Sequence, residues 1–108
     1  MGLLSKKRPP DWVRVAAESD FAHTMQVRYD NRDFALFKTA AGIFCSQPSC
    51  SHEYSPLVEG IIEGTAVHCE KHGSRFDLQS GRVLDLPASA DLVMYPVRIE
   101  NGEIWIKV

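Results

Sequence analysis

Two short pairs of cysteine and histidine carry the most specific chemical signal in this chain of 108 residues. One residue separates Cys50 from His52, two residues separate Cys69 from His72, and sixteen residues lie between the pairs. Each pair is short enough to lie on one loop, so the two loops can face each other across one site. Two thiolates and two imidazoles make a complete set of four ligands for zinc or for an iron–sulfur cluster.

The mixed composition of each pair helps to separate these metals. Zinc fingers commonly use a pair of cysteines followed by a pair of histidines, whereas each pair here contains one residue of each type. The single residue between Cys50 and His52 also keeps their side chains unusually close along the chain. A cluster with two irons accommodates this spacing, because the cysteine and the histidine of one loop can bind different irons.

This pattern resembles that of the Rieske [2Fe-2S] proteins, in which histidine replaces cysteine on one of the two irons. The resemblance implies that the chain holds one [2Fe-2S] cluster. It also implies that Cys50 and Cys69 bind one iron and that His52 and His72 bind the other. The likeness covers nearly the whole chain, and it includes Pro87 in a segment that looks like the loop covering the cluster in this family.

Departures from the respiratory branch of that family predict a lower reduction potential. High-potential Rieske proteins have an extra cysteine in each cluster loop, joined as a disulfide, and the matching positions here are Ser55 and Lys71. Phe76 replaces a tyrosine whose hydroxyl reaches a cysteine sulfur, whereas Ser74 matches a hydrogen-bonding serine of that branch. Fewer hydrogen bonds to sulfur should place the potential near the low end of a range of roughly −150 to +300 mV. The chain therefore resembles the small Rieske ferredoxins that serve bacterial oxygenases.

Alternating apolar and polar residues predict strands on both sides of the ligand pairs. Structure is expected to begin at Trp12, and Asn101-Gly102 between two alternating runs predicts a hairpin, because both turn residues favour positive φ. The first three alternating runs should form a meander. The expected strands cover residues 25–29, 34–39, 43–44, 95–99 and 104–108.

The middle of the chain has a different composition from these flanks. Residues from about 45 to 92 contain all three cysteines, three of the four histidines and four of the seven glycines. We therefore expect one domain over residues 1–108, with a flexible lead at 1–11 and a cluster-binding subdomain at about 45–92. The predicted class is all-β: a Rieske-type antiparallel β-sandwich with this loop-rich subdomain inserted.

Composition excludes several classes of partner. The formal net charge is −2, so binding to nucleic acid would lack its main electrostatic contribution. No apolar run is long enough to span a membrane, and the beginning of the chain does not have the pattern of a secretory signal. The odd number of cysteines, three, suits a metal site or reduced thiols, which predicts a cytoplasmic protein.

The function expected from the resemblance is one-electron transfer without substrate turnover. The electron would come from an NAD(P)H-dependent ferredoxin reductase, a flavoprotein, and would pass to a terminal Rieske non-haem iron oxygenase. The chain is not expected to be that ring-hydroxylating oxygenase, which needs a further iron site with two histidines and a carboxylate. Outside the ligand pairs, only His23 and His68 remain.

Two alternatives stay open from sequence: a small Rieske-like subunit of a nitrite reductase complex, and a zinc-binding module without redox activity. Cys45 could be another ligand, but a small buried hydrophobic residue is the favoured interpretation. His68 is expected to point away from the ligand loop, and His23 to be solvated. Trp105 has two interpretations, a docking aromatic residue or a cover for a second face of the sheet.

Overall fold

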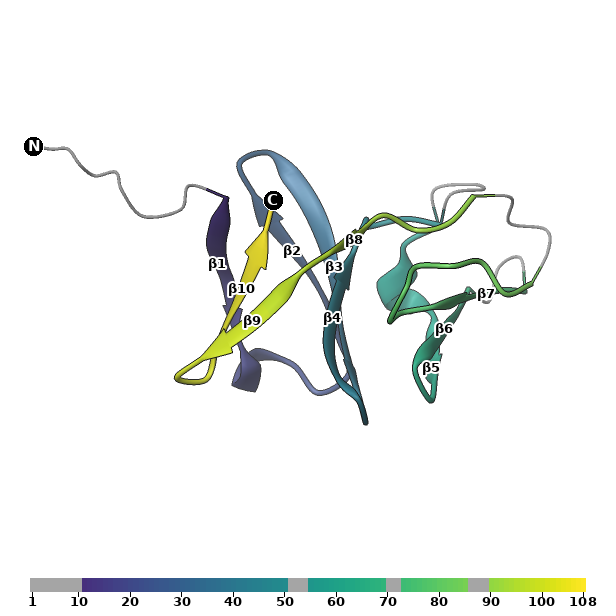
Figure 1. Cartoon of the computed structure of the whole chain (residues 1–108), viewed down its shortest axis with the longest axis horizontal. Coiled ribbons are helices and arrows are strands. Elements are labelled where there is room, and N and C mark those ends of the chain that lie inside the picture. The colour runs from purple at the N-terminus through teal and green to yellow at the C-terminus, as the bar shows by residue number, and fades with distance from the viewer. Residues whose placement is uncertain (1–10, 51–54, 70–72, 86–89) are drawn as a thin grey trace, which may run out of the picture.

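The computed structural model describes residues 11–50, 55–69, 73–85 and 90–108. Within these ranges the chain is built almost entirely of β-strands, with two single-turn 3-10 helices (Figure 1). No helix in them is long and apolar enough to cross a membrane. The elements are β1 (Trp12–Ala17), η2 (Glu18–Asp20), β2 (Thr24–Tyr29), β3 (Arg32–Thr39), β4 (Gly42–Ser46), η3 (Leu57–Glu59), β5 (Ile61–Glu63), β6 (Ala66–Cys69), β7 (Ser74–Asp77), β8 (Met94–Tyr95), β9 (Val97–Glu100) and β10 (Glu103–Lys107).

The strands form three antiparallel sheets. Their orders are β1–β10–β9, β2–β3–β4–β8 and β5–β6–β7. The first two sheets pack face to face, and the third lies at the other end of the molecule, between β4 and β8 in the chain (Figure 1). The all-β sandwich expected from sequence is confirmed, as is the meander of β2, β3 and β4. The middle segment, expected to be loop-rich, also contains a small sheet of its own.

Strand β3 is buried on both faces. Phe34 and Leu36 point into the core between the two large sheets, here called the sandwich core. Ala35 and Phe37 point the other way, into a second core, here called the loop core. All four side chains are at most 1% exposed. Because side chains alternate between the faces of a strand, β3 is shared by both cores.

The two cores occupy different parts of the molecule. The sandwich core joins β1 and β10 to β2, β3 and β4. The loop core joins the opposite face of β3 to the β5–β6–β7 sheet and to the connections around it. Its buried members are Ala35, Phe37, Cys50, Leu57, Val67, Cys69, Phe76, Leu78 and Leu92.

The hairpin predicted at the end of the chain is present. Asn101 and Gly102 have φ of 53° and 78° and join β9 to β10. Asp30 and Asn31, which join β2 to β3, also have positive φ, 52° and 63°. Two residues of positive φ twist a two-residue turn in the sense that the flanking strands require.

One strand expected from sequence is divided in two. The alternation of apolar residues over 95–99 suggested one strand, but β8 pairs with β4 and β9 pairs with β10. Pro96 lies between them and has no N–H to donate to a strand ladder. Its carbonyl accepts a hydrogen bond from the N–H of Lys107 at 3.0 Å. The chain therefore passes from one sheet of the sandwich to the other at this proline.

Gly81 joins the two ends of the connection between β7 and β8. Its N–H donates to the carbonyl of Asp77 at 2.6 Å, and its own carbonyl accepts from the N–H of Leu92 at 2.7 Å. It has φ of +84°, and a Cβ added there would lie 2.4 Å from the carbonyl oxygen of Leu92. Backbone occupies this space, so a side chain requires the connection to move.

Replacing Gly81 by alanine should destabilise the fold more than the same change at Gly64. Gly64 also has positive φ, +64°, but a Cβ there would meet open space. In the Gly64→Ala variant the free energy of unfolding should therefore fall only by the cost of placing alanine in a left-handed conformation, about 1–2 kcal/mol. In the Gly81→Ala variant the same cost applies, and the backbone of Leu92 must also move, so the free energy of unfolding should fall further. Urea unfolding measures both, and equal losses would contradict this description of Gly81.

Candidate metal centre

Both cysteines of the predicted ligand set lie in the loop core. Cys50 is 1% exposed and Cys69 is 3% exposed, and neither forms a disulfide. His52 and His72, the other predicted ligands, lie outside the described residues. Within the described part of the chain, no three histidine, cysteine or acidic side chains come together as a metal site. The structure thus brings the two predicted thiols into one buried region.

Backbone hydrogen bonds position Cys50. Its N–H donates to the carbonyl of Ser55 at 2.8 Å, and the N–H of Leu57 donates to the carbonyl of Pro48 at 3.0 Å. Ser49 and Pro56 form an isolated antiparallel bridge between these two bonds. The segments on either side of 51–54 are therefore paired like the two strands at the base of a hairpin. Cys50 and Ser55 form the last pair before residues 51–54.

Gln47 ties this hairpin to the large sheet. Its N–H donates to the carbonyl of Val93 at 3.0 Å, and its side-chain oxygen accepts from the N–H of Val93 at 2.8 Å. Its side-chain nitrogen donates to the carbonyl of Ser49 at 2.8 Å. The Gln47 side chain thus links the segment just before β8 with the loop that carries Cys50.

Cys69 is positioned by the end of a strand. It is the last residue of β6 and pairs with Ser74, the first residue of β7. The N–H of Gly73 donates to the carbonyl of Cys69 at 2.8 Å. Gly73 has φ of +75°, a conformation in which glycine has no steric penalty. The ladder and this turn fix the backbone on both sides of 70–72.

Some of the residues near the ligand pairs that were compared with the high-potential branch lie within the described part of the chain. Ser55 is 9% exposed, and among the residues that the structure describes its Oγ has no hydrogen-bond partner. Phe76 is fully buried in the loop core, and Ser74 is buried as well. Lys71 and Pro87 lie outside the described residues.

A charged network covers the outer face of the small sheet. Arg75 of β7 forms a hydrogen-bonded ion pair with Asp85, and its Nη1 lies 4.0 Å from Oε1 of Glu63. His68 Nδ1 lies 3.8 Å from Oε2 of the same glutamate. The Arg75 hydrogen bond lowers the pKa of Asp85. His68 therefore points outward, as expected, while its neighbour Cys69 points into the core.

Two further hydrogen bonds hold the chain on both sides of residues 86–89. The N–H of Leu84 donates to the carbonyl of Arg75 at 2.8 Å. The N–H of Val83 donates to Oδ1 of Asp91 at 2.8 Å. Sequence reasoning missed these contacts, because they depend on the register of β6 and β7 and on a turn between distant residues.

The remaining residues singled out from sequence fall outside this region. Cys45 is fully buried in the sandwich core, not the loop core, and burial raises the pKa of its thiol to about 12. This supports its interpretation as a small buried hydrophobic residue. His23 is exposed, as expected. Trp105 is half-buried between the fully buried Ile104 and Ile106.

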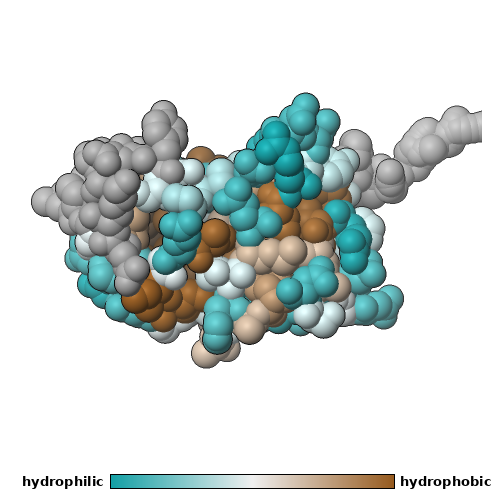
Figure 2. All heavy atoms as spheres, turned by 180° about the vertical axis from the view of Figure 1, so that it is seen from behind, coloured by the Kyte–Doolittle hydropathy of each residue, from teal (hydrophilic) through white to brown (hydrophobic). Residues whose placement is uncertain are grey.

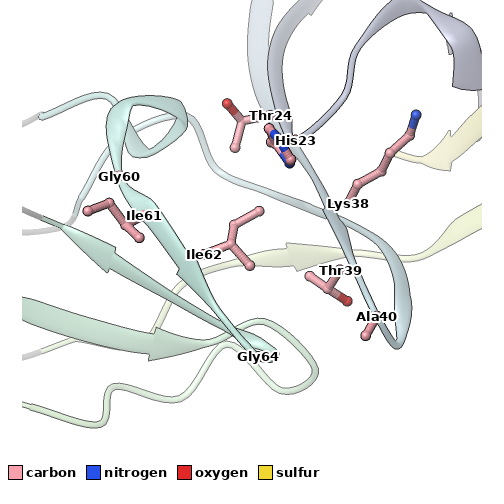
Figure 3. Close-up of a pocket in the computed structure, with 9 residues that line it drawn as sticks. All are labelled: His23, Thr24, Lys38, Thr39, Ala40, Gly60, Ile61, Ile62 and Gly64. Carbon is pink, nitrogen blue, oxygen red and sulfur yellow. The ribbon is translucent and has the colours of Figure 1, made fainter.

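An open pocket of about 520 Å³ lies between the large sheet and the small one. Figure 3 shows His23 and Thr24 on one side and Ile61 and Ile62 on the other. Lys38 extends away from the isoleucines, and its Nζ donates to the carbonyls of Glu18 and Phe21. No thiol lines this pocket among its described residues, so it is separate from the candidate metal centre.

Comparisons with known proteins agree with the sequence pattern. A family model described as the Rieske [2Fe-2S] domain matches residues 11–96. The chain is 28% identical over 100 residues to the ferredoxin component of the naphthalene 1,2-dioxygenase/salicylate 5-hydroxylase systems of Ralstonia sp., which covers 91% of this chain and 96% of that protein. It is 38% identical over 73 residues to the 3-phenylpropionate/cinnamic acid dioxygenase ferredoxin subunit of Escherichia coli strain K12, covering 67% and 69%.

A solved structure shares the fold. The match is to a chain in the complex of reduced oxygenase and oxidized ferredoxin in carbazole 1,9a-dioxygenase. It has a TM-score of 0.82 at 22% identity and covers 92% of this chain and 94% of that one.

The ion pair of Arg75 with Asp85 should make stability depend on pH in a defined direction. A lowered native pKa means that the carboxylate contributes stability above the unfolded value, about 3.9, and loses it as the pH falls through the native value. Asp85→Asn should thus lower the free energy of unfolding modestly near neutral pH, because both side chains are partly exposed. Urea unfolding of both proteins from about pH 7 towards about pH 3 should show the difference shrinking. A difference that grows in acid would contradict this assignment.

Proposed function

Because the chain belongs to the Rieske [2Fe-2S] domain family, we propose that it is a one-electron carrier that passes electrons from an NAD(P)H-dependent ferredoxin reductase to a terminal Rieske non-haem iron oxygenase. The observation that carries this proposal is the match over nearly the full length of a relative named as a ferredoxin component, 91% of this chain and 96% of that protein. Such a component delivers electrons and turns over no substrate itself.

The described residues fit an iron–sulfur cluster. Cys50 and Cys69 supply two buried, unbridged thiols from two separate loops, which suits the soft ligands that such clusters need. We propose that His52 and His72 complete the set. With neutral imidazoles, two sulfides and two thiolates balance the charge of two ferric ions. A neutral oxidised centre costs less to place in an apolar core than a charged one.

When bound, the cluster would accept and release one electron, and the protein's part is to hold and cover it. Leu57, Val67 and Leu92 pack in the loop core together with both cysteines and exclude water from the thiol side. Gln47 and the β6–β7 ladder fix the two loop bases, so their backbones need not rearrange when the charge changes.

The proposed partners are the terminal oxygenase and a flavoprotein reductase. Support for the first comes from the complex of reduced oxygenase and oxidized ferredoxin in carbazole 1,9a-dioxygenase, a chain of which shares this fold. The reductase is inferred from the need for an electron source. We propose a cytoplasmic location, because both the reduced nicotinamide and three unbridged cysteines suit that compartment.

Metal and sulfide analysis tests the ligand set. The purified protein should contain two irons and two acid-labile sulfides per chain. Cys50→Ser should lose most of both, because a thiolate ligand is removed. Cys45→Ala is the matched control and should keep them, because Cys45 belongs to the other core. One zinc and no sulfide would instead indicate the zinc-binding module.

Electron delivery tests the function itself. The chain, reduced by NAD(P)H through a flavoprotein reductase of the same organism, should be reoxidised by the oxygenase with turnover of the oxygenase substrate. Omitting the chain, or using Cys50→Ser, should abolish turnover while the reductase alone stays active. A reduced chain that no oxygenase reoxidises, but that purifies within a nitrite reductase complex, would support the subunit alternative.

A further inference from the structure

The hydroxyl of Ser55 is an unexplained feature of the candidate metal centre. Its Oγ is buried and has no hydrogen-bond partner, and it is the one such side-chain atom found within the described residues. The residue as a whole is 9% exposed. Leaving a buried hydroxyl unpaired costs roughly 1–3 kcal/mol, so such a group points to a partner bound in the same region.

The backbone holds Ser55 beside a proposed ligand. The carbonyl of Ser55 accepts the N–H of Cys50 at 2.8 Å, so the two residues face each other at the base of one loop. The next residue, Pro56, forms the bridge with Ser49. These bonds place the backbone of Ser55 next to that of Cys50, on a different loop from Cys69, which ends β6.

Another buried serine satisfies its hydroxyl inside the protein. Ser46, which is fully buried in β4, donates its hydroxyl to the carbonyl of Gln47 at 2.7 Å. Ser55 has the same side chain at similar burial without such a bond. The contrast indicates that the Ser55 hydroxyl is available to an acceptor that the described residues do not provide.

We propose that the Ser55 hydroxyl donates a hydrogen bond to a sulfur of the iron–sulfur cluster and thereby raises its reduction potential. This inference rests on the proposed function, because it requires the cluster. Sulfide and thiolate sulfurs are acceptors, and they carry more negative charge after the cluster gains an electron. The hydroxyl keeps its proton in both states and binds the reduced state more strongly.

The hydrogen bond replaces part of what the chain lacks compared with the high-potential branch. Ser55 stands where those proteins have a disulfide cysteine, and Phe76 offers no hydroxyl in place of their tyrosine. Phe76 is fully buried in the loop core. In this proposal Ser55 contacts the cluster directly and tunes its potential, and it takes no part in substrate turnover.

The test compares midpoint potentials and visible spectra of purified, cluster-loaded variants. Ser55→Ala should lower the equilibrium constant for reduction about tenfold, a fall of about 59 mV for a one-electron couple. Ser55→Thr and Ser55→Val have the same shape and differ only in the hydroxyl, so the threonine variant should keep the higher potential of the two. Ser46→Ala is the control, and it should leave the potential unchanged even if it lowers stability.

Every outcome bears on the assignment. Equal potentials for Ser55→Thr and Ser55→Val, or for the wild type and Ser55→Ala, would overturn it and leave the electron-carrier function intact. Loss of the cluster from the alanine and valine variants but not from the threonine variant would support it. Loss from all three would show that packing, not the hydroxyl, matters, and would overturn it. A wild-type protein that binds no iron and sulfide would instead overturn the proposed function.

Discussion

The four consecutive residues from Phe34 to Phe37 are buried on both faces of one strand, and both cores depend on this arrangement. Phe34 and Leu36 fill the sandwich core, whereas Ala35 and Phe37 form the floor of the loop core that contains Cys50 and Cys69. A slip of one residue in the register of β3 would exchange these two sets of side chains. The meander with β2 and β4 fixes that register on both sides.

The position of the candidate metal centre follows from this shared strand. The β5–β6–β7 sheet packs against the large sheet through the loop core, and Gln47 and Gly81 tie the connections at its edges. Figure 2, a view from behind, shows hydrophobic atoms between polar ones close to the grey atoms at this end of the molecule. The loops that carry Cys50 and Cys69 are thus held to the large sheet by packing and by backbone and side-chain hydrogen bonds.

The features that depend on residues close together in the sequence could be predicted from it. The ligand pairs, the Asn101-Gly102 hairpin and the strands of the meander could all be identified from neighbouring residues, because spacing and alternation act over short distances. The division at Pro96 was missed, since apolar alternation continues through it and only pairing partners reveal it. The Arg75–Asp85 pair and the unpaired Ser55 hydroxyl depend on contacts and burial that no sequence pattern encodes.

The burial of Cys45 has a consequence for a protein that works beside oxygen-activating partners. Oxidation, alkylation and disulfide exchange all require the thiolate. Because burial raises the pKa of this thiol to about 12, almost none of it is ionised near neutral pH. The thiol is also fully enclosed by the sandwich core. In the folded chain the Cys45 thiol is therefore a poor ligand for iron and a poor target for oxidation, although no disulfide protects it.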